Sequence, residues 1–327
     1  MMKIFLFFFT INFIFIYCFD LISKFLNVYD FPDKKRKFHD KKTPLLGGTI
    51  ILTNLILLIL IIFFNFSNLT FFIDNKYFVS FFLPIFLIFL IGIYDDKFSL
   101  TPYAKFFLIV VVLILTTYLD SDLLIKKIYI KSLNLSFSLG TFSAFFSILC
   151  ILLFINALNM FDGINLQVGF YSLIVILFFI LNKIFFHLSV FLLFPIITFL
   201  YLNFRNKTFL GDSGTHVLAF IISYIIIKQY NYSFQKISIE EIFILMMIPG
   251  IDMLRLFIQR LSKLNNPFVA DRNHIHHLLQ QNLEPKYVFC IIQLLIFLPI
   301  ILMSISPLLS IITGVCFYSL ILLKIIK

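Results

Sequence analysis

The chain has 327 residues, of which 61% are hydrophobic, 19% aromatic and only 13% charged, and its mean hydropathy is +1.05. A soluble globular domain has about 45–50% apolar and about 25% charged residues, so this composition excludes a water-soluble enzyme. The net charge of +10 need not indicate nucleic-acid binding, because lysine and arginine commonly flank membrane spans on the cytoplasmic side. We expect no nucleic-acid partner.

The apolar residues form long blocks close to the roughly 20 residues that a helix needs to cross a bilayer. They predict an all-α, polytopic integral membrane protein with about 10–11 transmembrane helices. The first block lacks a signal-peptidase site and is interpreted as a retained span. No repeat or low-complexity linker interrupts the chain, so residues 1–327 are expected to form one transmembrane domain. In chain order, the expected spans are residues 3–23, 45–64, 78–94, 103–119, 141–158, 164–181, 188–203, 214–230, 239–258, 287–303 and 305–323.

The basic residues predict the orientation. If the segment after the first span is cytoplasmic, 18 of the 26 lysines and arginines lie on the cytoplasmic side, as the positive-inside rule favours. The N-terminus is then outside and the C-terminus cytoplasmic. The polar residues whose side chains could take part in catalysis or binding also lie at cytoplasmic ends or loops. The four cysteines lie inside apolar blocks without a CxxC pair, which predicts free thiols; they are Cys18, Cys150, Cys290 and Cys316.

The first polar motif, KKRKFHDKKTPLLGG, runs from Lys34 to Gly48. Its lysines either anchor the protein at the membrane surface or form a basic rim that binds phosphates, with Lys41 as a candidate. Gly47 and Gly48, at the start of a span, would permit close approach of another group to the backbone.

The second motif places Asp95 and Asp96 at the end of an apolar block. Two adjacent carboxylates at such a position are costly unless water or a cation compensates them. Mg²⁺ prefers oxygen ligands and commonly bridges to substrate phosphates. Solvated residues at a helix end are the alternative. Lys105 either neutralises a phosphate or extends to the membrane surface.

The third and fourth motifs are NALNMFDGIN and FLGDSGTHVLAF. Asn156 and Asn159 would share one helix face, and together with Asp162 they can read a nucleobase edge or complete a metal shell. Asp212 precedes another span. It is either a helix N-cap or, if it lies near Asp95 and Asp96, a candidate magnesium ligand.

The fifth motif ends in DRNHIHHLL. His274 and His277 have the spacing to share a helical face, which His276 cannot fully share. The spacing fits no standard zinc site. Arg272 has the planar guanidinium that grips a diphosphate. An amphipathic cytoplasmic loop is the alternative, but it leaves three clustered histidines unexplained.

In their order and spacing, these segments resemble the polyprenyl-phosphate N-acetylhexosamine-1-phosphate transferase family, the WecA/MraY-like group of glycosyltransferase family 4. The DRNHIHH form is similar to the WecA-like branch. The resemblance implies a bacterial cytoplasmic-membrane enzyme with its active site facing the cytoplasm, which begins cell-surface polysaccharide synthesis. Leu166–Gln167 and Thr215–His216 depart from the family pattern and leave the sugar open.

The implied reaction moves a sugar-1-phosphate, expected to be N-acetylhexosamine-1-phosphate, from a UDP-sugar to undecaprenyl phosphate and releases UMP. The implied cofactor is Mg²⁺, with Mn²⁺ as an alternative, held by Asp212 and Asn159. The implied catalytic residues are Asp95, Asp96, Asp212, His276 and His277. Those implied for substrate binding are Asn156, Asn159, Asp162, Arg272, His274, Lys105 and Lys41. A homodimer is considered as well.

Two other classes of protein remain as alternatives. A polyprenyl-lipid transporter or flippase would place its functional polar groups near the middle of the membrane, whereas these cluster at one surface. A non-catalytic scaffold would tolerate joint replacement of Asp95, Asp96 and Asp212.

Overall fold

The computed structural model describes residues 2–32, 41–64, 75–233, 236–264, 266 and 271–326. Residues 34–40 of the first motif and residues 267–270, before the histidine motif, lie outside the described residues.

Most of the described chain is helical, as its composition predicts. Each expected span coincides with a helix or, for the first span, with a bent pair of helices. The helices are α1 (Met2–Tyr17), α2 (Phe19–Leu26), α3 (Gly47–Phe63), α4 (Asn75–Phe98), α5 (Pro102–Leu119), α6 (Ser143–Phe161), α7 (Gln167–Leu181), α8 (Phe186–Phe204), α9 (Gly211–Tyr232), α10 (Ile239–Ser262), α11 (Ile275–Gln280), α12 (Pro285–Leu302) and α13 (Pro307–Ile326).

Six of the described helical segments are long and apolar enough to cross a membrane. The pair α1 and α2 would add a seventh span, but it bends by 69° between the two helices. Helices α3 and α7 are apolar and shorter. Helix α9 is buried along nearly its whole length, so it meets protein rather than lipid and needs less hydrophobicity. The six segments are Phe78–Phe98, Pro102–Leu119, Gly140–Phe161, Phe186–Phe204, Pro285–Leu302 and Pro307–Ile325.

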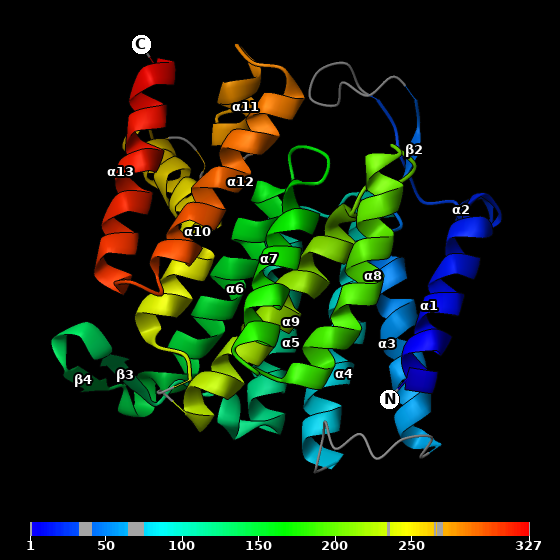
Figure 1. Cartoon of the computed structure of the whole chain (residues 1–327), viewed down its shortest axis with the longest axis horizontal. Coiled ribbons are helices and arrows are strands. Elements are labelled where there is room, and N and C mark those ends of the chain that lie inside the picture. The colour runs from blue at the N-terminus through cyan, green and yellow to red at the C-terminus, as the bar shows by residue number, and fades with distance from the viewer. Residues whose placement is uncertain are drawn as a thin grey trace.

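Two small antiparallel sheets accompany the helices. Strand β1 (Tyr29–Asp30) pairs with β2 (Thr43–Pro44), and β3 (Lys127–Ile130) pairs with β4 (Leu135–Ser138). Neither sheet was expected from the sequence. The β3–β4 hairpin lies at the end of the bundle opposite α11 and the end of α13 (Figure 1).

Helix α9 forms the centre of the bundle, with α3, α4 and α6 packed around it. Its first turn lies very close to two neighbouring helices. A Cβ atom on Gly48 would lie 2.7 Å from the backbone nitrogen of Gly214, and one on Gly92 would lie 2.6 Å from that of Ser213. The close approach predicted for the glycine pair is therefore confirmed, and the partner is the chain's own α9.

The segment before α3 is also bound to the start of α9. Gly47 N–H donates to the Phe209 carbonyl at 3.1 Å, and Gly48 N–H donates to the Leu210 carbonyl at 3.2 Å. Phe209 N–H in turn donates to Pro44 at 2.9 Å. These contacts and the glycine contacts place the first residues of α9 at a defined position among α3 and α4.

A buried polar network lies near the β3–β4 end of the bundle. Asp120, fully buried just after α5, accepts a hydrogen bond from Ser80 at 2.9 Å and pairs with Lys228 at 2.7 Å. The Tyr224 hydroxyl lies 3.5 Å from the same carboxylate. With these partners the charge is compensated, as a buried carboxylate requires.

Candidate active site

A cavity of about 960 Å³ opens where α4 and α6 end and α9 begins. Of the residues predicted for the site, its lining includes Lys41, Asp95, Asp96, Asn159, Asp162, Asp212, Arg272 and His277. The first and the last of the motifs that supply them are more than 200 residues apart in the chain. The fold therefore brings together groups that the sequence shows only as separate motifs.

Asp96 caps the start of α9. One carboxylate oxygen accepts the backbone N–H of Asp212 at 2.8 Å. The other accepts the N–H of Ser213 at 3.2 Å and its hydroxyl at 2.8 Å. The first turn of a helix has unpaired N–H donors that favour a carboxylate. Asp96 therefore positions Asp212, and its oxygens are already engaged by this role.

Lys105, at the beginning of α5, bridges two of the other acids. Its Nζ lies 2.7 Å from Asp95 Oδ2 and 2.5 Å from Asp212 Oδ2. Asp95 also accepts the backbone N–H of Leu100. The lysine predicted to bind substrate thus neutralises part of the acidic cluster, and its contact with a phosphate would compete with these two carboxylates.

Asn159 joins the cluster from the last turn of α6. Its side chain is hydrogen-bonded to Asp212, and its Oδ1 accepts the Thr215 hydroxyl at 2.9 Å. The two residues predicted to hold a metal are therefore direct neighbours. They come from the end of one helix and the start of another.

Asp162 follows α6 and lines the same cavity. Burial, together with the negative charges of Asp212 and Asp96, raises the pKa of its carboxyl to about 7. A single lysine, Lys105, pairs with both Asp95 and Asp212. Part of the negative charge around Asp162 is therefore not balanced. A bound cation would relieve this repulsion.

The raised pKa of Asp162 predicts a pH dependence of stability. The folded pKa of about 7 exceeds the usual 3.8, so between these values the folded protein binds more protons than the unfolded chain. This contribution to stability is complete at low pH and is lost as the pH rises to 7. Between pH 5 and 7.5, the unfolding temperature of the detergent-solubilised Asp162→Asn variant should fall less than that of wild type. Equal slopes would contradict this assignment.

Four predicted residues are not among those that line the cavity. One is Lys105, which contacts Asp95 and Asp212 as described above. Asn156 donates to the Leu152 carbonyl of its own helix at 2.8 Å. His274 is buried against Asp252, with 2.8 Å between its Nδ1 and a carboxylate oxygen. His276 is fully buried, and its ring presses against Gly163. The structure therefore places the last three side chains behind the cavity wall.

The predicted arrangement of the histidines on one helical face is wrong. Helix α11 begins at Ile275, and His274 precedes it with an extended backbone, so helical spacing does not apply to it. Instead, the rings of His274 and His276 are parallel, with centroids 5.6 Å apart. His276 meets His277 edge-on at 4.2 Å. Burial and neighbouring positive charge lower the pKa of His276 well below its usual value, so it is neutral.

The cavity also contains polar residues that the sequence analysis did not select. Asn203 supports the loop after Asp162, since its Oδ1 accepts the N–H of Leu166 at 2.6 Å and its amide donates to Thr208 at 2.6 Å. A polar residue at the end of an apolar helix was the available signal. The others are Asp30, Thr43, Ser99, Asn165, Asn206 and Gln280.

The donor set suits a magnesium ion that is shared with a substrate. Among the described residues, no three acidic, imidazole or thiol groups converge to enclose a metal on their own. Mg²⁺ often uses one or two carboxylates together with substrate phosphates and water. Asp212 and Asn159 offer adjacent oxygen ligands. Burial is the main cause of the raised pKa of Asp162, and the negative charges of Asp212 and Asp96 add to it.

Comparison with known proteins shows a similarity to one family. The sequence model of glycosyl transferase family 4 matches residues 78–230. Over this segment the chain is similar to glycosyl transferase family 4. The matched segment contains all three helix junctions that carry the acidic cluster, and the histidine motif lies outside it. This similarity agrees with the family that the motifs resemble.

Two bacterial relatives align with most of the chain. It is 27% identical over 278 residues, 80% of its length, to undecaprenyl-phosphate alpha-N-acetylglucosaminyl 1-phosphate transferase of Escherichia coli (strain K12), of which 71% is covered. It is 28% identical over 254 residues, 75% of its length, to a protein of Bacillus subtilis (strain 168) named "probable undecaprenyl-phosphate N-acetylglucosaminyl 1-phosphate transferase", of which 67% is covered.

Proposed function

We propose that this protein transfers N-acetylhexosamine-1-phosphate from a UDP-sugar to undecaprenyl phosphate and releases UMP. The observation that carries the proposal is the convergence of Asp95, Asp162, Asp212 and Asn159 in one cavity at one end of a helical bundle. The names of the aligned family members supply the acceptor and the transferred group. The identity of the hexosamine is open.

In this reaction, an oxygen of the lipid phosphate attacks the phosphorus that carries the sugar. The bond from this phosphorus to the bridging oxygen of the diphosphate breaks, and UMP leaves with the electron pair. A phosphate monoester has a second pKa near ~6, so the acceptor is largely dianionic at neutral pH. Such a transfer depends mainly on positioning and charge neutralisation. Asp96 fits this requirement because, as a helix cap, it positions Asp212.

The residues divide this work by location. Arg272 and His277 also line the cavity, and they are suited to hold the diphosphate. Asp212 and Asn159 would hold Mg²⁺, which when bound neutralises charge on the diphosphate. Asp95 keeps Lys105 beside Asp212. Lys41, at the cavity margin, supplies a further positive charge for a phosphate.

The membrane setting supports a lipid acceptor. The protein is a multi-pass membrane protein, and α1 begins at the end of the bundle opposite the end of α13 (Figure 1). The distribution of basic residues supports a cytoplasmic-membrane location with the cavity facing the cytoplasm. The transporter alternative is not favoured, because the aligned relatives are transferases and the acidic groups lie at helix ends. The homodimer stays a prediction.

The direct test uses membranes that contain the expressed protein. They are incubated with undecaprenyl phosphate, Mg²⁺ and each of several UDP-N-acetylhexosamines, and UMP and the lipid product are measured. We expect equal amounts of UMP and lipid-linked sugar phosphate with one donor, and loss of both products with EDTA. Movement of the lipid across the bilayer without UMP release would contradict the proposal.

A further inference from the structure

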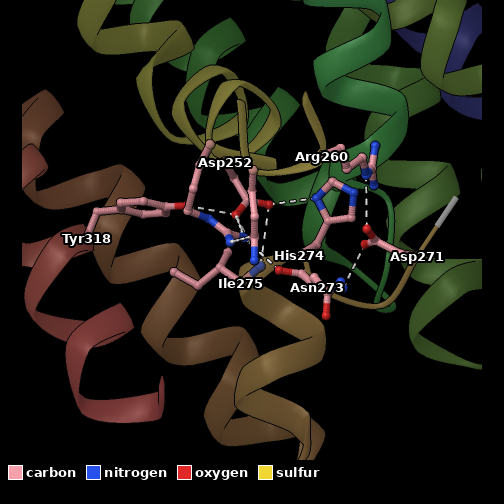
Figure 2. A network of polar contacts seen from close by, with 9 residues as sticks. Asp252, Arg260, Asp271, Asn273, His274, Ile275 and Tyr318 are labelled. Atoms are coloured by element: carbon pink, nitrogen blue, oxygen red, sulfur yellow. Dashed lines mark hydrogen bonds and ion pairs between the residues drawn. The ribbon is translucent and has the colours of Figure 1, made fainter. Parts of the chain in front are cut away.

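A second polar network lies inside the helical bundle, and the reaction as described does not use it. Asp252 of α10 is 1% exposed. Its carboxylate accepts hydrogen bonds from the Tyr318 hydroxyl at 2.7 Å, Arg255 at 2.9 Å and Ile275 N–H at 3.2 Å. The His274 ring is its fourth partner, at 2.8 Å. Figure 2 shows Tyr318, His274 and Ile275 around Asp252.

The same network fixes the loop that presents Arg272 to the cavity. Arg255 donates to the Asn273 carbonyl at 2.6 Å. Asp271 accepts from Arg260 at 3.0 Å and from the Asn273 N–H at 2.9 Å. The residues on both sides of Arg272 are therefore anchored to α10, as Figure 2 also shows. A guanidinium on a tethered loop is presented to its ligand at a lower entropy cost.

The histidines extend the network to the cavity. His274, held by Asp252, stacks on His276, and His276 contacts His277 edge-on. His277 lines the cavity, whereas His276 fills the space against Gly163. A continuous series of contacts thus connects Asp252 with a side chain at the site.

Stability alone explains this arrangement poorly. A buried carboxylate in an apolar helix is costly, and replacing a buried ionic group with packed hydrophobic residues is often neutral or stabilising. Here the four donors to Asp252 come from α10, α13 and the segment at the start of α11. A charged centre with this many directional partners specifies one geometry of the loop.

We propose that Asp252 is a positioning residue for the transfer reaction, which orients Arg272 and His277 by holding His274 and the beginning of α11. The inference rests on the proposed function. Asp252 and its partners touch no substrate, so they act through the loop. The sequence offered one signal, an acidic residue with Arg255 three positions later inside an apolar helix.

The test measures UMP release per folded protein for Asp252→Asn, His274→Asn and the double variant. A misplacement of reacting groups by about 1 Å costs about 100-fold in rate, and we expect a loss of about 10- to 100-fold in kcat/KM for Asp252→Asn. If Asp252 acts through His274, the double variant loses little more than the single variants. Tyr318→Phe, which removes one of the four donors, should show a smaller loss with normal folding.

Asp120→Asn is the matched control, because Asp120 is also a buried, multiply bonded carboxylate but lies at the opposite end of the bundle. It should lower stability without lowering kcat/KM per folded protein. The inference is overturned if Asp252→Asn is no worse than Asp120→Asn, or if the losses of Asp252→Asn and His274→Asn multiply. If wild-type protein releases no UMP, the proposed function and this inference are both overturned. If wild type is active and either of the two variant results is found, this inference alone is overturned.

Discussion

Asp212→Asn should lower UMP release by at least about 100-fold, the loss typical for removal of one preorganised electrostatic contact in an active site, and leave the protein folded. The asparagine keeps the size of the side chain but loses the charge that pairs with Lys105. The helix cap survives, because Asp96 binds the backbone N–H of this residue rather than its side chain. The measurement is UMP release per folded protein, quantified after size-exclusion chromatography in detergent.

Asp122→Asn is the control for this prediction. Asp122 also pairs with a lysine, Lys228 at 3.4 Å, but it is about half exposed and lies near the β3–β4 end of the bundle. Its loss should leave UMP release within about twofold of wild type, since exposed ion pairs contribute little. Near-normal release by Asp212→Asn would remove this residue from the catalytic machinery.

Gly92→Ala should damage both the fold and the site. The added methyl group would overlap the backbone at Ser213, with the Ser213 nitrogen only 2.6 Å away. Backbone atoms of two packed helices cannot yield as a flexible side chain can, so α4 and α9 must separate. Overpacking of this kind costs about 1–3 kcal/mol, and the shift moves Asp212 away from Asp96 and Asn159. We expect a lower unfolding temperature and a loss of UMP release in the folded fraction.

Gly250→Ala provides the matched comparison. Gly250 is also inside a helix, but apart from its chain neighbours and the nearby backbone of its own helix, no atom of the described residues lies within 4 Å of the position that its Cβ would take. Alanine has a higher helix propensity than glycine by about 1 kcal/mol, so this variant should be as stable as wild type or more stable. If Gly92→Ala behaved like Gly250→Ala, the close packing of α4 against α9 would not be what positions Asp212.

The helical fold could be read from the sequence because hydrophobic blocks of bilayer length have few other structural solutions. The bend at Cys18 and the hairpin at residues 127–138 could not be predicted, because both depend on packing within the bundle rather than on a local pattern. The central position of α9 could not be predicted from the sequence either. Its sequence is less apolar than that of α4, and only the three-dimensional arrangement shows that other helices surround it.

The acidic residues of the site could be selected from the sequence, but their roles could not be separated. Asp95 and Asp96 are adjacent in the chain, yet one pairs with Lys105 and the other caps α9. The difference arises because consecutive residues at the end of a helix point in different directions. His274 was likewise selected for its residue type, whereas its position before α11 and its bond to Asp252 depend on a partner 22 residues earlier in the chain.

The proposed reaction requires the acidic cluster to bind a divalent cation together with a nucleotide diphosphate. The most direct measurement is the dissociation constant of UDP-N-acetylhexosamine for the purified protein, with Mg²⁺ and with EDTA, for wild type and Asp212→Asn. We predict that Mg²⁺ strengthens binding to wild type and that Asp212→Asn loses most of this gain. Equal affinity of wild type with and without the cation, or a full gain in the variant, would contradict the account.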